Sequence, residues 1–256
     1  MAHGYIPSRE AHLSALWLKV VKSEITRPRN PAMVVAVSTS IPQYRSLYSQ
    51  ARELANYMLR KMRFEKVATI YSSSFVPEIM VRDDGVSALP ACYVHIARGE
   101  RDVLLFSGDT SPMEDQYEFA RILLDYAREL GVKELFSVGA RWAESPISPD
   151  ADPEPNGFAT DSIGVAKLKE KGVKIVPEEP APFFASIVVG LASEYGIRGY
   201  KLSVDHGEPS PHPKSVFKIL GILSTLAGFD IAMDELRSQA SSSCPPRQAG
   251  KDAVYH

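Results

Sequence analysis

The chain has 256 residues, of which 45% are hydrophobic, 9% aromatic and 23% charged, so it can bury a sizeable core in one large domain or two small ones. Lys and Arg number 29 against 31 Asp and Glu, a formal net charge of -2 that lacks the basic excess of proteins binding nucleic acid through phosphate contacts. No stretch approaches the roughly 20 apolar residues of a membrane-spanning helix, so neither nucleic acid nor a membrane is an expected partner.

Cysteine usage and the first residues favour the cytoplasm. The only two cysteines are Cys92, in an apolar run, and Cys244, in a Ser/Pro-rich stretch, so a disulfide framework is not expected. The first 21 residues lack a basic start, a clean apolar core and a small-residue cleavage site, and we therefore expect no signal peptide.

The first half of the sequence alternates between strand and helix patterns. An edge strand is predicted over 16–20, and the apolar run Met33–Val37 predicts a strand covered on both faces. Apolar residues at three- and four-residue spacing over 48–62 predict an amphipathic helix. Asp84-Gly85 predicts a tight hairpin, because glycine supplies the positive φ of such a turn. Further strands are predicted over 66–71, 91–96 and 102–107.

The clearest helix signal begins at Ser111. Serine is a favoured N-cap, Pro112 suits the first helical position, acidic residues follow, and Gly131 predicts the end. The remaining expected elements are a strand over 132–138, a Pro/Asp-rich loop over 145–157, helices over 162–171, 183–195 and 213–227, and strands over 173–176 and 200–204. This alternation predicts a three-layer α/β sandwich with a largely parallel mixed sheet.

The last residues have a different composition. From Ser238 onward the sequence is small, polar and Pro-containing, and it cannot bury enough surface to offset the entropy of ordering. We therefore predict a single domain over 1–237 and a flexible tail over 238–256, whose r.m.s. reach as a flexible linker is about 20 Å.

Two segments could form a ligand cleft at the carboxyl end of the sheet, where α/β proteins bind ligands. The first carries Arg141, Trp142 and Glu144 directly after Gly139, and its structural interpretation is that Trp142 caps the core while Arg141 pairs with Glu144. The second, Asp205-His206-Gly207-Glu208 with the nearby His212, matches no standard metal-ligand spacing, so no metal site is expected.

Other signatures of catalysis or cofactor binding are weak. Ser38–Ser40 follows a buried strand, where a phosphate could sit at a helix start, but the glycines that allow close backbone approach are missing and a capping turn is favoured. The sequence has no G-x-S-x-G elbow, and neither cysteine lies in a catalytic signature. We expect no cofactor and no enzymatic activity.

Three segments carry a family resemblance. Asp102–Pro112, Tyr117–Val132 and Leu135–Gly139, with agreement downstream to Leu236, resemble the proteasome assembly chaperone family, specifically the second-subunit type and its archaeal homologues. The resemblance covers roughly residues 31–236 and rests on apolar and glycine positions. The sequence departs from the pattern at Ser38–Pro42, where many relatives have a glycine-rich turn.

The resemblance implies a nucleoside-phosphorylase-like fold, no common enzymatic activity, and association with the proteasome core particle. Some archaeal relatives end in a hydrophobic-Tyr-any motif that docks between α-ring subunits, and Val254, Tyr255 and His256 match that motif. We therefore expect a proteasome-binding assembly chaperone or activator homologue that works as a homo-oligomer. The alternatives are a phosphorylase-like or hydrolytic enzyme using the two cleft segments, and an interaction scaffold for some other partner.

Overall fold

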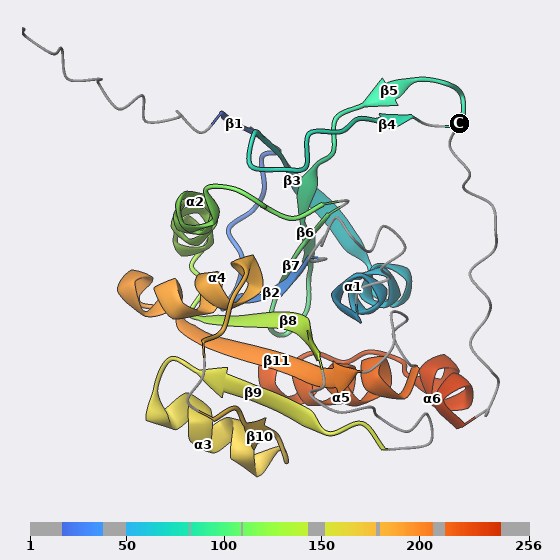
Figure 1. The fold of residues 1–256 in the computed structure, drawn as a ribbon, viewed down its shortest axis with the longest axis vertical. Coiled ribbons are helices and arrows are strands. Elements are labelled where there is room, and N and C mark those ends of the chain that lie inside the picture. Colours follow the sequence, from blue (N-terminus) through green and yellow to red (C-terminus); the bar gives the residue numbers. More distant parts are fainter. Residues whose placement is uncertain are drawn as a thin grey trace, which may run out of the picture.

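The fold is a mixed sheet of nine strands, among the described residues, with helices on both faces (Figure 1). The computed structural model describes residues 17–37, 50–81, 83–108, 110–142, 152–177, 180–206 and 213–241; at positions 80, 140–142 and 206 it describes the backbone alone. The strand order is β1-β3-β6-β7-β2-β8-β11-β9-β10. Within the described ranges, every helix is too short or too polar to cross a bilayer.

The centre of the sheet is parallel. It consists of β7 (Val103–Gly108), β2 (Ala32–Ala36), β8 (Glu134–Trp142) and β11 (Arg198–His206). All five residues of β2 are buried, which confirms the prediction of a strand covered on both faces.

Antiparallel pairing extends the sheet on both sides of this centre. On one side lie β6 (Cys92–Ala97), β3 (Phe64–Ser72) and the edge strand β1 (Leu18–Lys22). On the other side β9 (Pro155–Ala159) runs antiparallel to β11, and β10 (Lys174–Ile175) runs parallel to β9. Four neighbouring pairs are thus parallel and four antiparallel, so the sheet is mixed, as predicted. Three of the parallel pairs lie at the centre, and the fourth, β9 with β10, lies at one edge. The predicted hairpin is also present: β4 (Met80–Val81) pairs with β5 (Ser87–Ala88), and Gly85 has a φ of 78°.

Helices cover both faces and confirm the predicted layers (Figure 1). One face carries α2 (Gln116–Glu129) and α4 (Phe184–Ala192), the latter followed by the short 3-10 helix η1 (Ser193–Tyr195). The other carries α1 (Gln50–Lys61) and α5 (Pro213–Ala227), with α3 (Ser162–Glu170) beside β9 and β10, and α6 (Asp234–Ser241) against α5.

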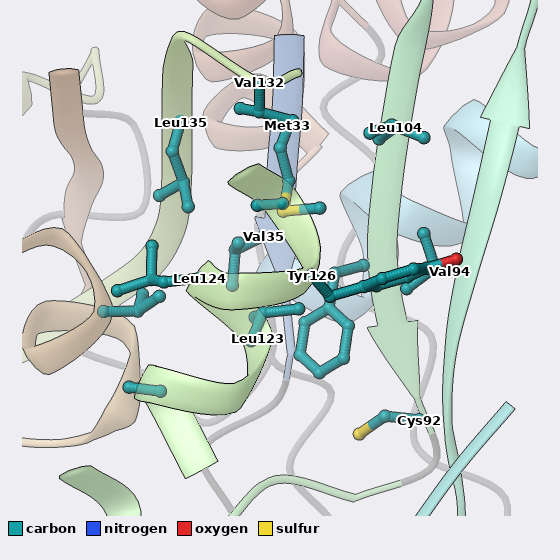
Figure 2. Close-up of a cluster of buried hydrophobic side chains, with 14 of the residues drawn as sticks. Met33, Val35, Cys92, Val94, Leu104, Leu123, Leu124, Tyr126, Val132 and Leu135 are labelled. Carbon is teal, nitrogen blue, oxygen red and sulfur yellow. The ribbon is translucent and has the colours of Figure 1, made fainter. Parts of the chain in front are cut away.

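Each face of the sheet has its own hydrophobic core. Figure 2 shows the core beneath α2, where Leu123, Leu124 and Tyr126 lie against side chains of the central strands such as Met33 and Val35. On the opposite face Phe136 and Tyr200 stack with their ring centroids 4.6 Å apart. Both cores are built from the alternation of side chains along the same strands.

Two local predictions are wrong, and one boundary differs. Helix α2 starts at Gln116 instead of Ser111, because the N–H groups of Met113 and Glu114 donate to the carbonyl of Ser74 and hold the preceding loop out of the helix. Strand β9 begins inside the predicted loop over 145–157 and continues to Ala159. Helix α6 continues to Ser241, a few residues beyond the boundary predicted at 237.

Candidate functional site

The structure brings the two predicted cleft segments together. Strands β8 and β11 pair in parallel, with Arg141 opposite Asp205 and Trp142 opposite His206. The segments therefore end side by side at the carboxyl edge of the sheet. Some of the residues singled out in the sequence lie outside the described residues: Glu144, Gly207–Glu208, His212, Ser38–Pro42, Cys244 and Val254–His256.

A chain of hydrogen bonds crosses this edge. The Ser203 hydroxyl donates to Oδ1 of Asn156 at 2.5 Å, and Nδ2 of Asn156 donates to Oδ1 of Asp205 at 2.6 Å. One strand over, the Ser137 hydroxyl donates to the carbonyl of Ala185, in the first turn of α4, at 2.6 Å. Together with Lys201, these side chains form what we call the polar cluster: Ser137, Asn156, Lys201, Ser203 and Asp205.

The polar cluster lies on the side of the sheet that faces α4. Tyr200, Leu202 and Val204 of β11 point into the core on the α5 side, so the alternating residues of β11 point the other way. Lys201 is opposite Ser137 in the strand register, and Ser203 is opposite Gly139. The sheet thus places polar side chains in consecutive rows beneath the first turn of α4.

Lys201 is the most unusual member of the polar cluster. Its residue is only 7% exposed, and among the described residues no group accepts a hydrogen bond from its Nζ. Burial lowers the pKa of this amine to about 7. A Cβ at Gly139 would come within 2.3 Å of Nζ, so the absence of a side chain at Gly139 makes room for the amine. Near neutral pH the site therefore holds an amine that is readily deprotonated, and a deprotonated amine is a base and a nucleophile.

Sequence reasoning found Asp205 and missed the rest of the polar cluster. The period-2 pattern of Lys201, Ser203 and Asp205 places the three on one strand face and could have indicated them. Asn156 could not be placed, because its strand was predicted to be a loop. Among the described residues no three His, Cys, Asp or Glu side chains form a group able to hold a metal ion.

A pocket of about 500 Å³ lies at the opposite ends of β8 and β11. Four of its charged lining residues already form ion pairs: Arg101, Glu134, Asp161 and Arg198. Glu134 binds Nη2 of Arg101 at 2.9 Å and Nζ of Lys167 at 3.0 Å, and it accepts a hydrogen bond from the Tyr200 hydroxyl at 3.1 Å. Beside it, Nε of Arg198 lies 2.7 Å from Oδ2 of Asp161. These contacts link β8 and β11 to each other, to Arg101 and to helix α3, so we assign this pocket a structural role.

Glu134→Ala should lower the free energy of unfolding by about 3 kcal/mol, because it leaves partly buried cations without their counter-charge. Burial alone would raise the pKa of Glu134, but the hydrogen bonds from Lys167 and Arg101 outweigh it and hold the pKa below 4.5. The stabilisation is therefore present above pH 4.5 and is lost as the pH falls through the lower pKa of the folded state.

Urea titrations at pH 7 and at pH 3 measure this difference. Glu118→Ala is the matched control, because Glu118 pairs with Arg121 on the exposed surface of α2 and should cost less than about 0.5 kcal/mol. Equal losses for the two variants would show that the Glu134 contacts do not hold the strands together.

Several solved structures share this fold. The fold is similar to that of Pyrococcus furiosus PbaB, described as an archaeal proteasome activator, with a TM-score of 0.73 at 19% identity over 87% of this chain and 94% of that chain. Pyrococcus furiosus PbaA, an archaeal homolog of proteasome-assembly chaperone, gives 0.68 at 15% identity, over 87% and 91%. A Mycobacterium tuberculosis proteasome-assembly chaperone homologue gives 0.67 at 19% identity, over 81% and 90%.

At these identities the likeness to solved structures establishes a shared fold alone. No curated protein matches the sequence significantly. The sequence model of the PAC2 family, however, matches residues 51–244, from the first turn of α1 to beyond the end of α6. Because this match spans well over half of the chain and includes every element from α1 to α6, the chain belongs to the PAC2 family.

Proposed function

We propose that the chain is a non-enzymatic proteasome-binding protein, an assembly chaperone or activator homologue of the cytoplasm. The observation that carries this proposal is membership of the PAC2 family, joined to the similarity of the fold to an archaeal proteasome activator and to proteasome-assembly chaperone homologues. The chain docks by Val254, Tyr255 and His256, which match a hydrophobic-Tyr-any motif, into pockets between adjacent subunits of the proteasome α-ring.

The chemistry of these three residues suits such a pocket. Val254 offers apolar area, and Tyr255 adds a ring that buries well and a hydroxyl that can find a hydrogen-bond partner. In a chain that ends at His256, the terminal carboxylate pairs with a basic side chain in the pocket, a charge-assisted contact. One such segment binds weakly, in about the micromolar range, because it must be ordered on docking.

Several copies of this C-terminal motif presented together would bind far more tightly than a single copy. A homo-oligomer offers several copies of the motif, and linked sites gain in apparent affinity by about 100-fold or more without any new contact. The stretch of chain beyond Ser241 supplies the reach to one pocket while the folded body stays above the ring. The proposal therefore includes a homo-oligomer.

Tyr255→Ala, and separately a short extension beyond His256, should each reduce binding to archaeal-type core particles at least tenfold. The first removes the ring and the second displaces the carboxylate, and both leave the described fold unchanged. Surface plasmon resonance on immobilised core particles measures the effect, with Ser243→Ala as a control in the same stretch of chain. Unchanged binding by the extended chain would show that the position of the carboxylate does not matter.

A second candidate function rests on the polar cluster. The cluster extends from the middle of β8 and β11, at Ser137 and the buried amine of Lys201, to Asp205 near the carboxyl edge of the parallel strands, where α/β proteins bind small ligands. In this alternative the chain is a phosphorylase-like or hydrolytic enzyme. A thermal-shift screen with nucleosides, phosphate and divalent metals tests it, since a ligand of the native state raises the melting temperature. A shift that is lost in Lys201→Met would favour the enzyme.

A further inference from the structure

A hairpin on this chain exposes an unusual amount of apolar surface. We call residues 78–89 the arm; it contains β4, β5 and the turn at Gly85, and it projects beyond β3 and β6 on the side of the sheet that carries α1 (Figure 1). Four aliphatic side chains of the arm are more than half exposed: Ile79, Val81, Val86 and Leu89. A two-stranded ribbon is at best marginally stable in water without packing against another surface. The arm is therefore expected to gain stability from a partner that covers it.

The same side of the sheet has an incompletely covered face. Helix α1 packs against β2, β7 and β8, while the neighbouring strands β1, β3 and β6 turn a set of partly or fully exposed residues outward on that side. The register places these residues on one face, since Lys19 pairs with Tyr71, Val21 with Thr69, and Lys66 with His95. We call it the open face: Lys19, Val21, Lys66, Thr69, Tyr71, Tyr93 and His95.

The charges of the two surfaces are complementary. The arm carries Glu78, Asp83 and Asp84 against one arginine, Arg82. The open face carries Lys19 and Lys66, and Nζ of Lys66 lies 5.3 Å from the centroid of the Tyr93 ring. Burial and the nearby Lys66 lower the pKa of His95, so its ring is neutral at pH 7. An acidic aliphatic arm thus matches a basic aromatic face.

The arm does not cover the open face of its own chain. Its four aliphatic side chains are exposed, and so is Val21 at the outer strand of the open face, at 49%. Because the arm and the open face lie on the same side of the sheet, two copies facing each other across a two-fold axis can each place an arm on the other's open face. This is an isologous arrangement, in which both contacts form at once.

We propose that the occupant of the open face is the arm of a second copy of this chain, and that this exchange holds the protein as a dimer. The inference deepens the homo-oligomer of the proposed function and does not depend on proteasome binding. The dimer presents two copies of Val254, Tyr255 and His256.

Light scattering with size-exclusion chromatography of the purified full chain, without proteasome, tests the exchange. Val86→Asp in the arm and Val21→Asp in the open face should each weaken self-association at least tenfold and give monomers at micromolar concentration. Ile163→Asp is the matched control, because Ile163 is a 57% exposed aliphatic residue on α3, away from both surfaces. A monomeric wild type, or a Val86→Asp dimer as stable as the wild type, would overturn the proposal.

A charge exchange tests whether the arm binds the open face. Asp83→Lys and Lys66→Glu should each weaken the dimer, and the double variant should recover most of the loss. A double variant weaker than both single variants would show that the arm binds elsewhere. Circular dichroism of each variant separates dissociation from unfolding. If the wild-type chain forms the dimer but does not bind the core particle, this result would contradict the proposed function and leave the arm exchange standing.

Discussion

Replacing Lys201 by methionine is expected to raise the free energy of unfolding at pH 7 by about 4 kcal/mol, since each pKa unit corresponds to about 1.4 kcal/mol and the folded amine is half protonated at this pH. The amine has a pKa of about 7 in the folded state against 10.5 in the free side chain, and burial is the cause. Folding at neutral pH must therefore remove a proton from the amine or bury its charge. Methionine has a similar length and no charge, so it removes this cost and keeps the packing above Gly139.

The gain should depend on pH in a defined direction. Below pH 7 the amine is protonated in both states, and the wild type bears the full cost of a buried charge. Between pH 7 and 10.5 the unfolded chain holds a proton that the folded chain has released, so the stability of the wild type rises with pH by about 1.4 kcal/mol per unit relative to the variant. Above pH 10.5 the amine is deprotonated in both states, and the difference in free energy of unfolding between the variant and the wild type stops changing.

Denaturant titrations at pH 6, 8 and 10 measure this difference in free energy of unfolding between the variant and the wild type. Lys169→Met on the exposed surface of α3 is the control and should change stability by less than about 0.5 kcal/mol at every pH. A Lys201→Met variant that is less stable than the wild type at all three pH values would contradict the account, because it would mean that the amine has a stabilising partner.

Patterns within a segment predicted most of the fold. The apolar run of β2 and the spaced apolar residues of α1 predicted these two elements correctly. Helix α5 begins and ends where it was predicted, at Pro213 and Ala227. In these segments local periodicity and burial agree.

Tertiary contacts explain why the start of α2 and the strand β9 were predicted wrongly. Ser111 and Pro112 have the residue types of a helix start, but the carbonyl of Ser74, distant in sequence, binds the following N–H groups. Pro155, Asn156 and Gly157 have turn-forming residue types, yet they form a strand because β11 pairs with them. A Cβ at Gly157 would lie 2.1 Å from the carbonyl oxygen of Lys201, so this glycine permits the close pairing.

The sequence predicted the neighbourhood of the polar cluster, but most of its members were not predicted; the ligand cleft itself stays a prediction. The sequence predicted that the ends of two strands would meet, and Arg141 does lie opposite Asp205. The sequence did not predict that Lys201 is buried, because a lysine in a strand is usually solvated. Its burial comes from the first turn of α4, over residues that are distant in sequence, and no local pattern encodes that contact.

Removal of Val254, Tyr255 and His256 is expected to reduce binding to the core particle by at least about 100-fold, since every copy in the oligomer loses its docking residues at once. The deletion should leave the fold unchanged, because the described elements end at Ser241. Substitution of Ser241, Ser242 and Ser243 by alanine alters the same stretch of chain and keeps the motif, so this control should bind as the wild type does.

The most direct test of the account is therefore the affinity of the full chain and of the chain ending at Ala253 for an archaeal-type proteasome core particle, measured under identical conditions. The account predicts binding by the full chain and, at the same concentrations, none by the shortened chain. Equal binding by the two chains would contradict docking through Val254, Tyr255 and His256, and binding by neither would contradict the proteasome as partner.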